Sequence, residues 1–200
     1  MIPFQEIVFP ELVKDVQDIF WDHIFTVAHS TLPSMQNNGV HSCFIKDEPK
    51  YVELIRVAEK YPFLSRDLYI FNLAPKFVTK IHLDGHPNHN VGQRHLGINI
   101  PIRGCTEKCI TEIYNFPESD FYVEPKYNVR VLKPGIEDSL PPPALSYCLT
   151  DKIVMLNPQV PHRVNNLNND EIRTSVSWTV KANWTLNDIL NYVSANNTTI

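Results

Sequence analysis

Short runs of β-forming residues, separated by clusters of Pro, Gly, Asn and Asp, fill the middle of this 200-residue chain. The runs are rich in β-branched and aromatic residues, which favour strands, and the residues between them favour turns. Eight short strands in this arrangement predict two packed sheets, as in a sandwich or a jelly roll. The predicted strands span residues 68–73, 76–83, 96–102, 110–116, 129–132, 146–149, 153–156 and 174–180.

Helical periodicity lies on either side of these strands. The first predicted helix places Leu12, Val16 and Ile19 on one face, with Pro10 in its first turn. We therefore expect a mainly β fold with flanking helices. The predicted helices span residues 10–21, 49–61 and 186–193.

The length and composition fit one domain. A chain of 200 residues with 43% hydrophobic content can bury a proper core, and no repeat or linker divides it. We expect a single domain over residues 1–200. Its parts are a helical N-terminal flank of about 1–66, a barrel core of about 67–180 and a C-terminal helix of about 185–195.

The charge pattern gives no sign of a nucleic-acid partner, because the net charge is -4 and the Lys and Arg residues are scattered. We see no signal peptide and no stretch near the roughly 20 apolar residues of a membrane span. The four cysteines are few and unevenly spaced, which predicts reduced thiols. These features predict a cytoplasmic protein without a membrane partner, and they give no evidence for a nucleic-acid partner.

Two histidines and an aspartate form the motif that bears most on function. His82 and Asp84 are two residues apart, so on a strand they point to the same face, and His162 follows 78 residues after Asp84. Two imidazoles and one carboxylate on one face of a metal leave three positions open, which suits non-haem Fe(II) and dioxygen. We predict these three residues as iron ligands and as the catalytic residues.

An anion site is predicted beside the metal. Arg173 lies eleven residues beyond the distal histidine, and Ser175 shares its face on the last predicted strand. A 2-oxo acid can chelate iron through its keto oxygen and adjacent carboxylate, and its distant carboxylate then needs a fixed cation. The planar guanidinium of Arg173 supplies paired charge-assisted hydrogen bonds, to which Ser175 can add its hydroxyl. The hydroxyl of Tyr69, on the strand before His82, could also reach this co-substrate.

The ordered set of His82-x-Asp84, His162 and Arg173-x-Ser175 resembles the Fe(II)/2-oxoglutarate-dependent dioxygenase superfamily, over about half of the chain. The resemblance implies a double-stranded β-helix, which is a cupin-like jelly-roll barrel with iron at its mouth. It also implies that the arginine binds the far carboxylate of 2-oxoglutarate. The expected activity couples oxidative decarboxylation of 2-oxoglutarate to C–H oxidation of a substrate, most simply its hydroxylation.

A second segment points to one branch of that superfamily. Residues 93–101, QRHLGINIP, are similar to the R-x-H-L-G-L-x-x-P segment of the aspartyl/asparaginyl β-hydroxylase branch. The similarity implies that His95 helps to hold the co-substrate. Aligned on His95, the family's Arg falls on Gln93, and Arg94 is one residue out of phase. The branch commonly has Gly where this chain has Asp84.

Other interpretations of the same residues stay open. His82 with His86, His89 and His95 could form a zinc site, although such loosely spaced histidines rarely make a closed tetrahedral one. The chain could also be a non-catalytic cupin-like binding barrel, or a cupin-type hydrolase or isomerase that uses another divalent metal. The arginine–serine pair favours the oxygenase, because a barrel that only binds a metal has no need for a carboxylate clamp.

Three strand aromatics, Phe71, Tyr114 and Trp178, are predicted to pack in the core. Substrate choice in such barrels depends on loops that follow no general code. The sequence therefore predicts a small-molecule or peptide substrate and leaves the oligomeric state open.

Overall fold

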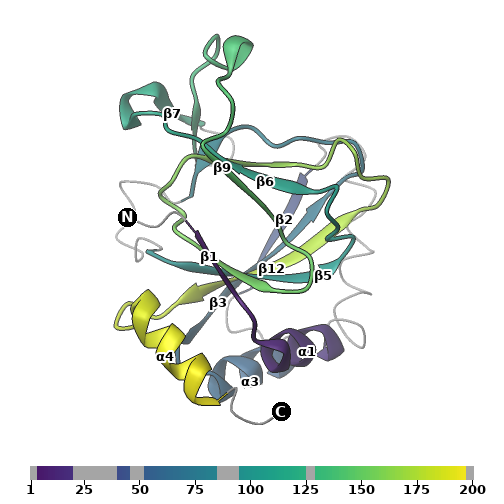
Figure 1. Ribbon diagram of the computed structural model, residues 1–200, viewed down its shortest axis with the longest axis vertical. Helices are drawn as coiled ribbons and strands as arrows, with labels where there is room; N and C mark the ends of the chain where they lie inside the picture. Colours follow the sequence, from purple (N-terminus) through teal and green to yellow (C-terminus); the bar gives the residue numbers. More distant parts are fainter. Residues whose placement is uncertain (1–3, 20–39, 46–51, 85–94, 125–128, 197–200) are drawn as a thin grey trace.

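The fold consists of two antiparallel six-stranded sheets that face each other, with helices on one side (Figure 1). The computed structural model describes residues 4–19, 40–45, 52–84, 95–124 and 129–196, with only the backbone of residues 40–45. Two such sheets with flanking helices make the double-stranded β-helix, or jelly roll, that the sequence predicts.

The first sheet has the strand order β1-β10-β5-β12-β3-β2. Its centre is β12, which pairs with β3 on one side and with β5 on the other. In chain order its strands are β1 (Phe4–Ile7), β2 (Val40–Ile45), β3 (Leu64–Leu73), β5 (Gly97–Arg103), β10 (Ile153–Leu156) and β12 (Arg173–Val180).

The second sheet has the strand order β7-β8-β4-β11-β6-β9. Its central pair is β4 and β11, which meet at a single register pair. In chain order its strands are β4 (His82–Leu83), β6 (Ile110–Ile113), β7 (Phe121–Glu124), β8 (Val129–Leu132), β9 (Leu145–Cys148) and β11 (His162–Asn165). Two short 3-10 helices, η3 (Glu118–Asp120) and η4 (Glu137–Ser139), flank the β7–β8 hairpin.

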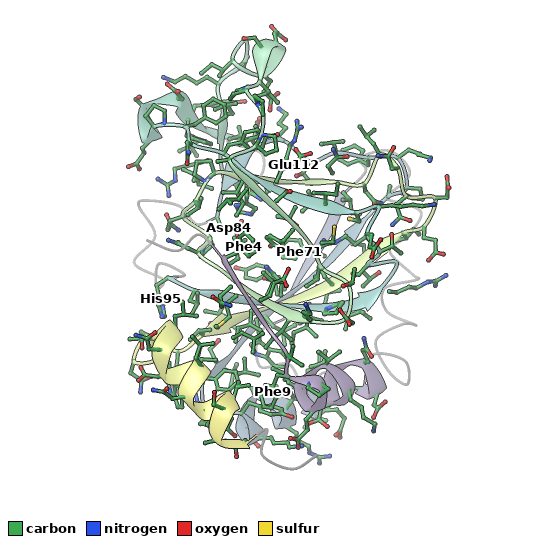
Figure 2. All side chains as sticks on the ribbon, in the orientation of Figure 1. Phe4, Phe9, Phe71, Asp84, His95 and Glu112 are labelled. Carbon is green, nitrogen blue, oxygen red and sulfur yellow. The ribbon has the colours of Figure 1, made fainter. Side chains whose placement is uncertain are left out.

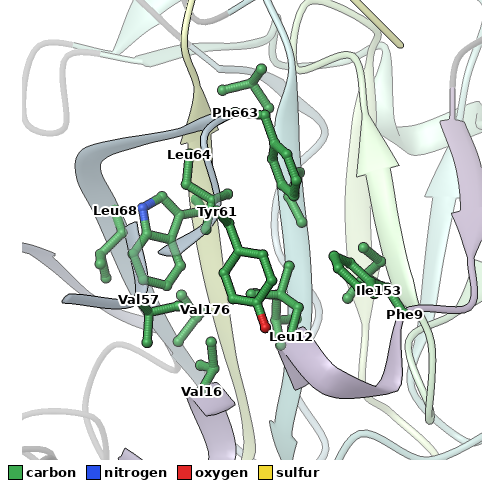
Figure 3. Close-up of a cluster of buried hydrophobic side chains, with 14 of the residues drawn as sticks. Phe9, Leu12, Val16, Val57, Tyr61, Phe63, Leu64, Leu68, Ile153 and Val176 are labelled. Atoms are coloured by element: carbon green, nitrogen blue, oxygen red, sulfur yellow. The ribbon is translucent and has the colours of Figure 1, made fainter. Parts of the chain in front are cut away.

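The main core lies between the first sheet and three helices, α1 (Pro10–Ile19), α3 (Val52–Lys60) and α4 (Leu186–Asn196). Figure 1 shows these helices on the side of the first sheet that faces away from β6 and β9. Trp178 of β12 is fully buried here, and its indole Nε1 donates to the carbonyl of Ser65 at 2.7 Å. Figure 3 shows part of this core, where Leu12 and Val16 of α1 contact the sheet side chains.

Strand alternation explains why the helices cover this face. Val176, Trp178 and Val180 of β12 point to the helices, together with Ile98 and Ile100 of β5. Successive strand residues point to opposite faces, so the residues between them point into the space between the sheets. The outward face of the second sheet carries a smaller apolar cluster, which includes Leu83, Phe121 and Leu132.

The predicted elements agree with the structure in type and differ mainly in extent. The strands predicted at 129–132 and 153–156 have the observed bounds, and the helices predicted at 49–61 and 186–193 correspond to α3 and α4. The helix predicted at 10–21 ends at Ile19, and residues 20 and 21 lie outside the described residues. Strands β1, β2 and β7 were not predicted, and β11 was anticipated only near its first residue, His162.

The strand predicted at 76–83 was wrong over most of its length. Only His82 and Leu83 form β4, and Val78 makes an isolated bridge with Asn165. Lys76 has a φ of 58°, in the left-handed region that interrupts an extended strand. The longest described helix has eleven residues, and none of the described helices has the length and apolarity to cross a bilayer.

Candidate active site

The structure brings the three predicted metal ligands together at the centre of the second sheet. His82 of β4 and His162 of β11 are direct register partners, and their ring centroids are 4.4 Å apart. Asp84 follows β4, with its Oδ1 3.5 Å from Nε2 of His82. One ligand atom from each residue lies within 4.8 Å of the others, so one ion can contact all three.

Backbone carbonyls orient both imidazole rings. The Nδ1 atom of His82 lies 2.9 Å from the carbonyl oxygen of Lys80, and that of His162 lies 2.8 Å from the carbonyl oxygen of Val160. A carbonyl oxygen only accepts hydrogen bonds, so each Nδ1 carries the proton and each Nε2 keeps its lone pair. Second contacts of this kind fix metal-binding histidines in proteins. The donor set therefore fits a divalent metal of the Fe(II) type.

A cavity of about 110 Å³ lies beside this triad, between the two sheets. A cavity of this kind needs about 10–15 Å³ to hold one water, so this one can hold several waters or a small ligand. The first sheet contributes a mixed wall, and the second sheet contributes the metal triad with its neighbours. The lining residues are Phe71, Asn72, Leu73, Thr79, His82, Asp84, Asn99, Thr111, Tyr147, Leu156, His162, Val164, Arg173, Ser175 and Ser177.

Arg173 and Ser175 both lie on the cavity face of β12, and their two-residue spacing had predicted that they share a face. Their register partners on β3 are Leu73 and Phe71. Arg173 is 93% buried, and no carboxylate in the described part of the chain is within ion-pair distance of its guanidinium. A buried charge is costly unless it is paired. The arginine therefore favours an anionic ligand in this cavity.

A tight turn packs against the same end of β12. Gly104 has a φ of 61°, and a Cβ there would lie 2.2 Å from the carbonyl oxygen of Ile172. Next to it, the thiol of Cys105 donates to the carbonyl oxygen of Thr174 at 3.1 Å. Burial raises the pKa of the Cys105 thiol, and the nearby charge of Arg173 opposes this rise. The thiol thus stays protonated beside the guanidinium and does not neutralise it.

Tyr147 is the main cavity residue that the sequence analysis missed. Burial raises the pKa of its phenol, although hydrogen bonds with the side chains of Thr111 and Asn99 and the charge of Arg173 oppose the rise. Asn99 in turn accepts a 2.6 Å hydrogen bond from the hydroxyl of Ser177. These contacts link β5 and β12 of the first sheet with β6 and β9 of the second across the cavity.

The sequence did contain a pattern that could have placed Ser177 on the cavity wall. Ser177 continues the two-residue spacing of Arg173 and Ser175, so alternation alone would have placed it on the cavity face. Tyr147 lies on the four-residue strand β9, where the sequence pattern leaves open which face is turned inward. Its position depends on the pairing of Thr111 with Tyr147, which the chain brings together only in the folded sheet.

The other predicted site residues have different positions. Tyr69 is half-buried and stacks on Phe71, with ring centroids 5.9 Å apart, but it is not among the residues that line the cavity. His95 is exposed, and its Nε2 lies 3.2 Å from the carbonyl oxygen of Trp184. Figure 2 shows His95 beside α4, away from Asp84. The structure therefore brings neither Tyr69 nor His95 to the cavity wall.

Predictions for several other residues can be compared with the structure in the same way. Tyr114 and Trp178 are buried core aromatics, as predicted. Phe71, predicted as a core aromatic, instead lines the cavity (Figure 2). The residues of the segment before His95, which are His86, His89, Gln93 and Arg94, lie outside the described residues.

No protein-family model matches this chain, and no curated protein matches it either. Solved structures to which this chain is similar include Escherichia coli ycfD, with 15% identity, a TM-score of 0.42, and coverage of 75% of this chain and 36% of that chain. A Pseudomonas putida prolyl-4-hydroxylase has 10% identity and a TM-score of 0.43, with coverage of 90% and 92%.

A second structure, described as Escherichia coli ribosomal oxygenase YcfD, has 13% identity and a TM-score of 0.38, with coverage of 75% of this chain and 34% of that chain. The chain thus spans about a third of the length of the YcfD chains that it matches. In this chain, a His-Asp-His triad and a buried arginine lie on the walls of one cavity.

Proposed function

We propose that this protein is an Fe(II)- and 2-oxoglutarate-dependent oxygenase that hydroxylates its substrate. One observation carries the proposal. A His-Asp-His ligand set and a buried arginine without a carboxylate partner among the described residues line the same small cavity. A metal site alone does not explain the arginine, and an anion site alone does not explain the triad.

The three ligands have distinct roles in this proposal. His82 and His162 would bind iron through Nε2, because their Nδ1 atoms are held by backbone carbonyls. Asp84 would add one negative charge that partly offsets the charge of Fe(II). When bound, the metal supplies the site at which dioxygen and the 2-oxo acid react. The overall reaction converts 2-oxoglutarate, dioxygen and R–H to succinate, carbon dioxide and R–OH.

Arg173 would bind the distant carboxylate of 2-oxoglutarate. Its guanidinium is rigid, remains charged and matches a carboxylate through two parallel hydrogen bonds. Ser175 shares the same face of β12 and can add its hydroxyl. The apolar residues Phe71, Leu73 and Leu156 would keep bulk water from this part of the cavity.

We further propose a small-molecule or peptide substrate in the cytoplasm, where the free thiols of Cys105, Cys109 and Cys148 would stay reduced. The aspartyl/asparaginyl β-hydroxylase branch remains a prediction from the sequence segment at residues 93–101. The proposed chemistry does not depend on that branch, because its metal ligands and carboxylate clamp come from other segments.

Anaerobic titration of the Fe(II) protein with 2-oxoglutarate tests the proposal directly. Chelation of iron by the 2-oxo acid should produce a metal-to-ligand charge-transfer band that saturates at one equivalent. Admission of air should then release succinate. Metal binding without the band would favour the non-catalytic barrel, and turnover of a substrate without succinate would favour a cupin-type hydrolase or isomerase.

A further inference from the structure

One short turn contacts two of the three proposed metal ligands, the backbone of Asp84 and the imidazole ring of His162. Residues 157–161 connect β10 to β11 and lead directly into His162. The carbonyl oxygen of Pro158 accepts from the backbone N–H of Asp84 at 2.8 Å, and that of Val160 accepts from Nδ1 of His162 at 2.8 Å. The position of this turn therefore affects two ligands at once.

Gln159 holds the other side of Asp84. Its Nε2 donates to the backbone carbonyl oxygen of Asp84 at 2.6 Å. The backbone N–H of Gln159 donates to Oδ1 of Asn157 at 3.0 Å, which closes the turn. Both backbone groups of Asp84 are thus bonded to adjacent residues of one turn. This arrangement fixes the backbone from which the carboxylate projects.

Arg130 decides which end of the Gln159 amide faces Asp84. Its Nη2 donates to Oε1 of Gln159 at 2.5 Å. A guanidinium has only donors, so it must face the amide oxygen, and the amide nitrogen must then face the carbonyl of Asp84. Arg130 lies on β8 and is the register partner of Leu83, the residue before Asp84.

Folding stability alone does not explain this arginine. The Arg130 side chain is only 12% exposed, and its Nε is buried with no hydrogen-bond partner among the described residues. Its Nη1 pairs with Glu118, whose side chain is 76% exposed. A buried, incompletely bonded arginine costs free energy that a side chain of similar shape without charge would avoid.

We propose that Gln159 and Arg130 are positioning residues for the metal centre. Arg130 orients the amide of Gln159, and Gln159 fixes the backbone of Asp84 so that its carboxylate meets the two imidazoles. Neither residue contacts the metal. The inference rests on the proposed function, since it takes His82, Asp84 and His162 as the ligands. Contacts of this outer kind typically change metal affinity by about 10- to 100-fold.

Metal binding by the full chain tests this inference without any turnover. Co(II) alone serves as the probe, because its visible absorption reports both affinity and ligand geometry. Gln159→Leu should weaken Co(II) binding by about 10-fold or more. Arg130→Met should weaken it by less, because the amide remains but loses its preferred orientation. Both variants should show a changed Co(II) spectrum at saturation.

Arg163→Met is the matched control. Arg163 is also a partly buried arginine of the second sheet, paired through Nε with Glu112, and it makes no described contact with Gln159 or Asp84. The control should keep the affinity and spectrum of the wild-type protein even if its thermal unfolding temperature falls. Arg130→Met should show the reverse pattern, with a changed spectrum and little loss of stability.

The outcomes separate this inference from the proposed function. Equal Co(II) affinity in the wild-type protein and in Asp84→Ala would overturn the ligand set itself. If Asp84→Ala does weaken Co(II) binding, the ligand set stands. Wild-type affinity and spectrum in Gln159→Leu and Arg130→Met would then overturn only the positioning role. A loss of Co(II) affinity in Arg163→Met equal to that in the two variants would also overturn the positioning role. If Gln159→Leu fails to fold, Arg130→Met decides.

Discussion

The two faces of β12 are both buried, but they differ in chemistry. The face toward the helices carries Val176, Trp178 and Val180, which pack in the main core. The opposite face carries Arg173 and Ser175, together with Ser177, and lines the cavity. Burial of apolar side chains stabilises a fold, whereas burial of polar ones costs free energy unless they are bonded. The polar face is therefore the one that stability does not explain.

A second comparison shows that buried charge alone does not mark a site. Glu112, on the outward face of the second sheet, accepts hydrogen bonds from Arg163, Tyr114 and Asn165. Within this Glu112 network, the carboxylate and the guanidinium of Arg163 pair with each other. Arg173 has no carboxylate partner among the described residues and faces a cavity instead. Arg163, which is paired with Glu112, therefore has a structural role, whereas Arg173, which faces the cavity, has the proposed functional one.

The largest expected effect is on the metal triad. His162→Ala removes one of three protein ligands, so Fe(II) binding should fall below detection and iron-dependent release of succinate should cease. Isothermal titration with Fe(II) under anaerobic conditions measures the loss, and circular dichroism checks that the sheets remain. Near-native iron affinity in this variant would mean that His162 is not a ligand.

The next effect is on stability and concerns the helix-facing side of β12. Trp178→Ala should lower the free energy of unfolding by about 3–5 kcal/mol, because it leaves a large cavity in the core. It also removes the hydrogen bond to Ser65. Urea unfolding followed by circular dichroism measures the change. A loss below 1 kcal/mol would contradict the assignment of this face to the core.

On the opposite face, Arg173→Ala should leave Fe(II) affinity nearly unchanged and weaken 2-oxoglutarate binding. The expected loss is on the order of 2–5 kcal/mol, because the truncation strands a desolvated carboxylate. Arg173→Lys should recover only part of it, since a point charge lacks the planar fork. The charge-transfer titration measures the 2-oxoglutarate affinity of both variants. Unchanged 2-oxoglutarate affinity in the alanine variant would remove the main argument for this co-substrate.

The smallest expected effect concerns the network of hydrogen bonds around Glu112. Burial alone would raise the pKa of the Glu112 carboxyl, but hydrogen bonds from Tyr114, Asn165 and Arg163 hold it below its ordinary value of 4.5. The unfolded chain then takes up the proton more readily than the folded one. The stabilisation is therefore present above about pH 4.5 and is lost as the pH falls through the lower pKa of the folded state.

Glu112→Gln tests this pH dependence. At neutral pH the variant should be less stable than the wild-type protein by about 1 kcal/mol, the usual scale for such hydrogen bonds. The difference should shrink as the pH is lowered below about 4.5. Urea unfolding of both proteins at pH 7 and at pH 3.5 to 4 measures this difference, with a precision on the order of a few tenths of a kcal/mol. A constant difference across this range would argue against the ion pair.

The sequence by itself determined the features that depend on local spacing. Alternation along a strand placed Arg173 and Ser175 on one face, and the β-rich runs with their turn residues predicted the jelly roll. The spacing of His82 and Asp84 was also informative. Their segment is nevertheless not the long strand that was predicted, because Lys76 interrupts it and β4 contains two residues.

Only the tertiary structure decided which distant residues meet. The pairing of His82 with His162 and of Thr111 with Tyr147 depends on strand register, which joins segments far apart in the chain. The same holds for the contacts of Gln159 with Asp84 and Arg130, which come from a turn, from the residue after β4 and from β8. Side-chain alternation is a local property of the backbone, whereas register between strands is fixed by the packing of the whole sheet.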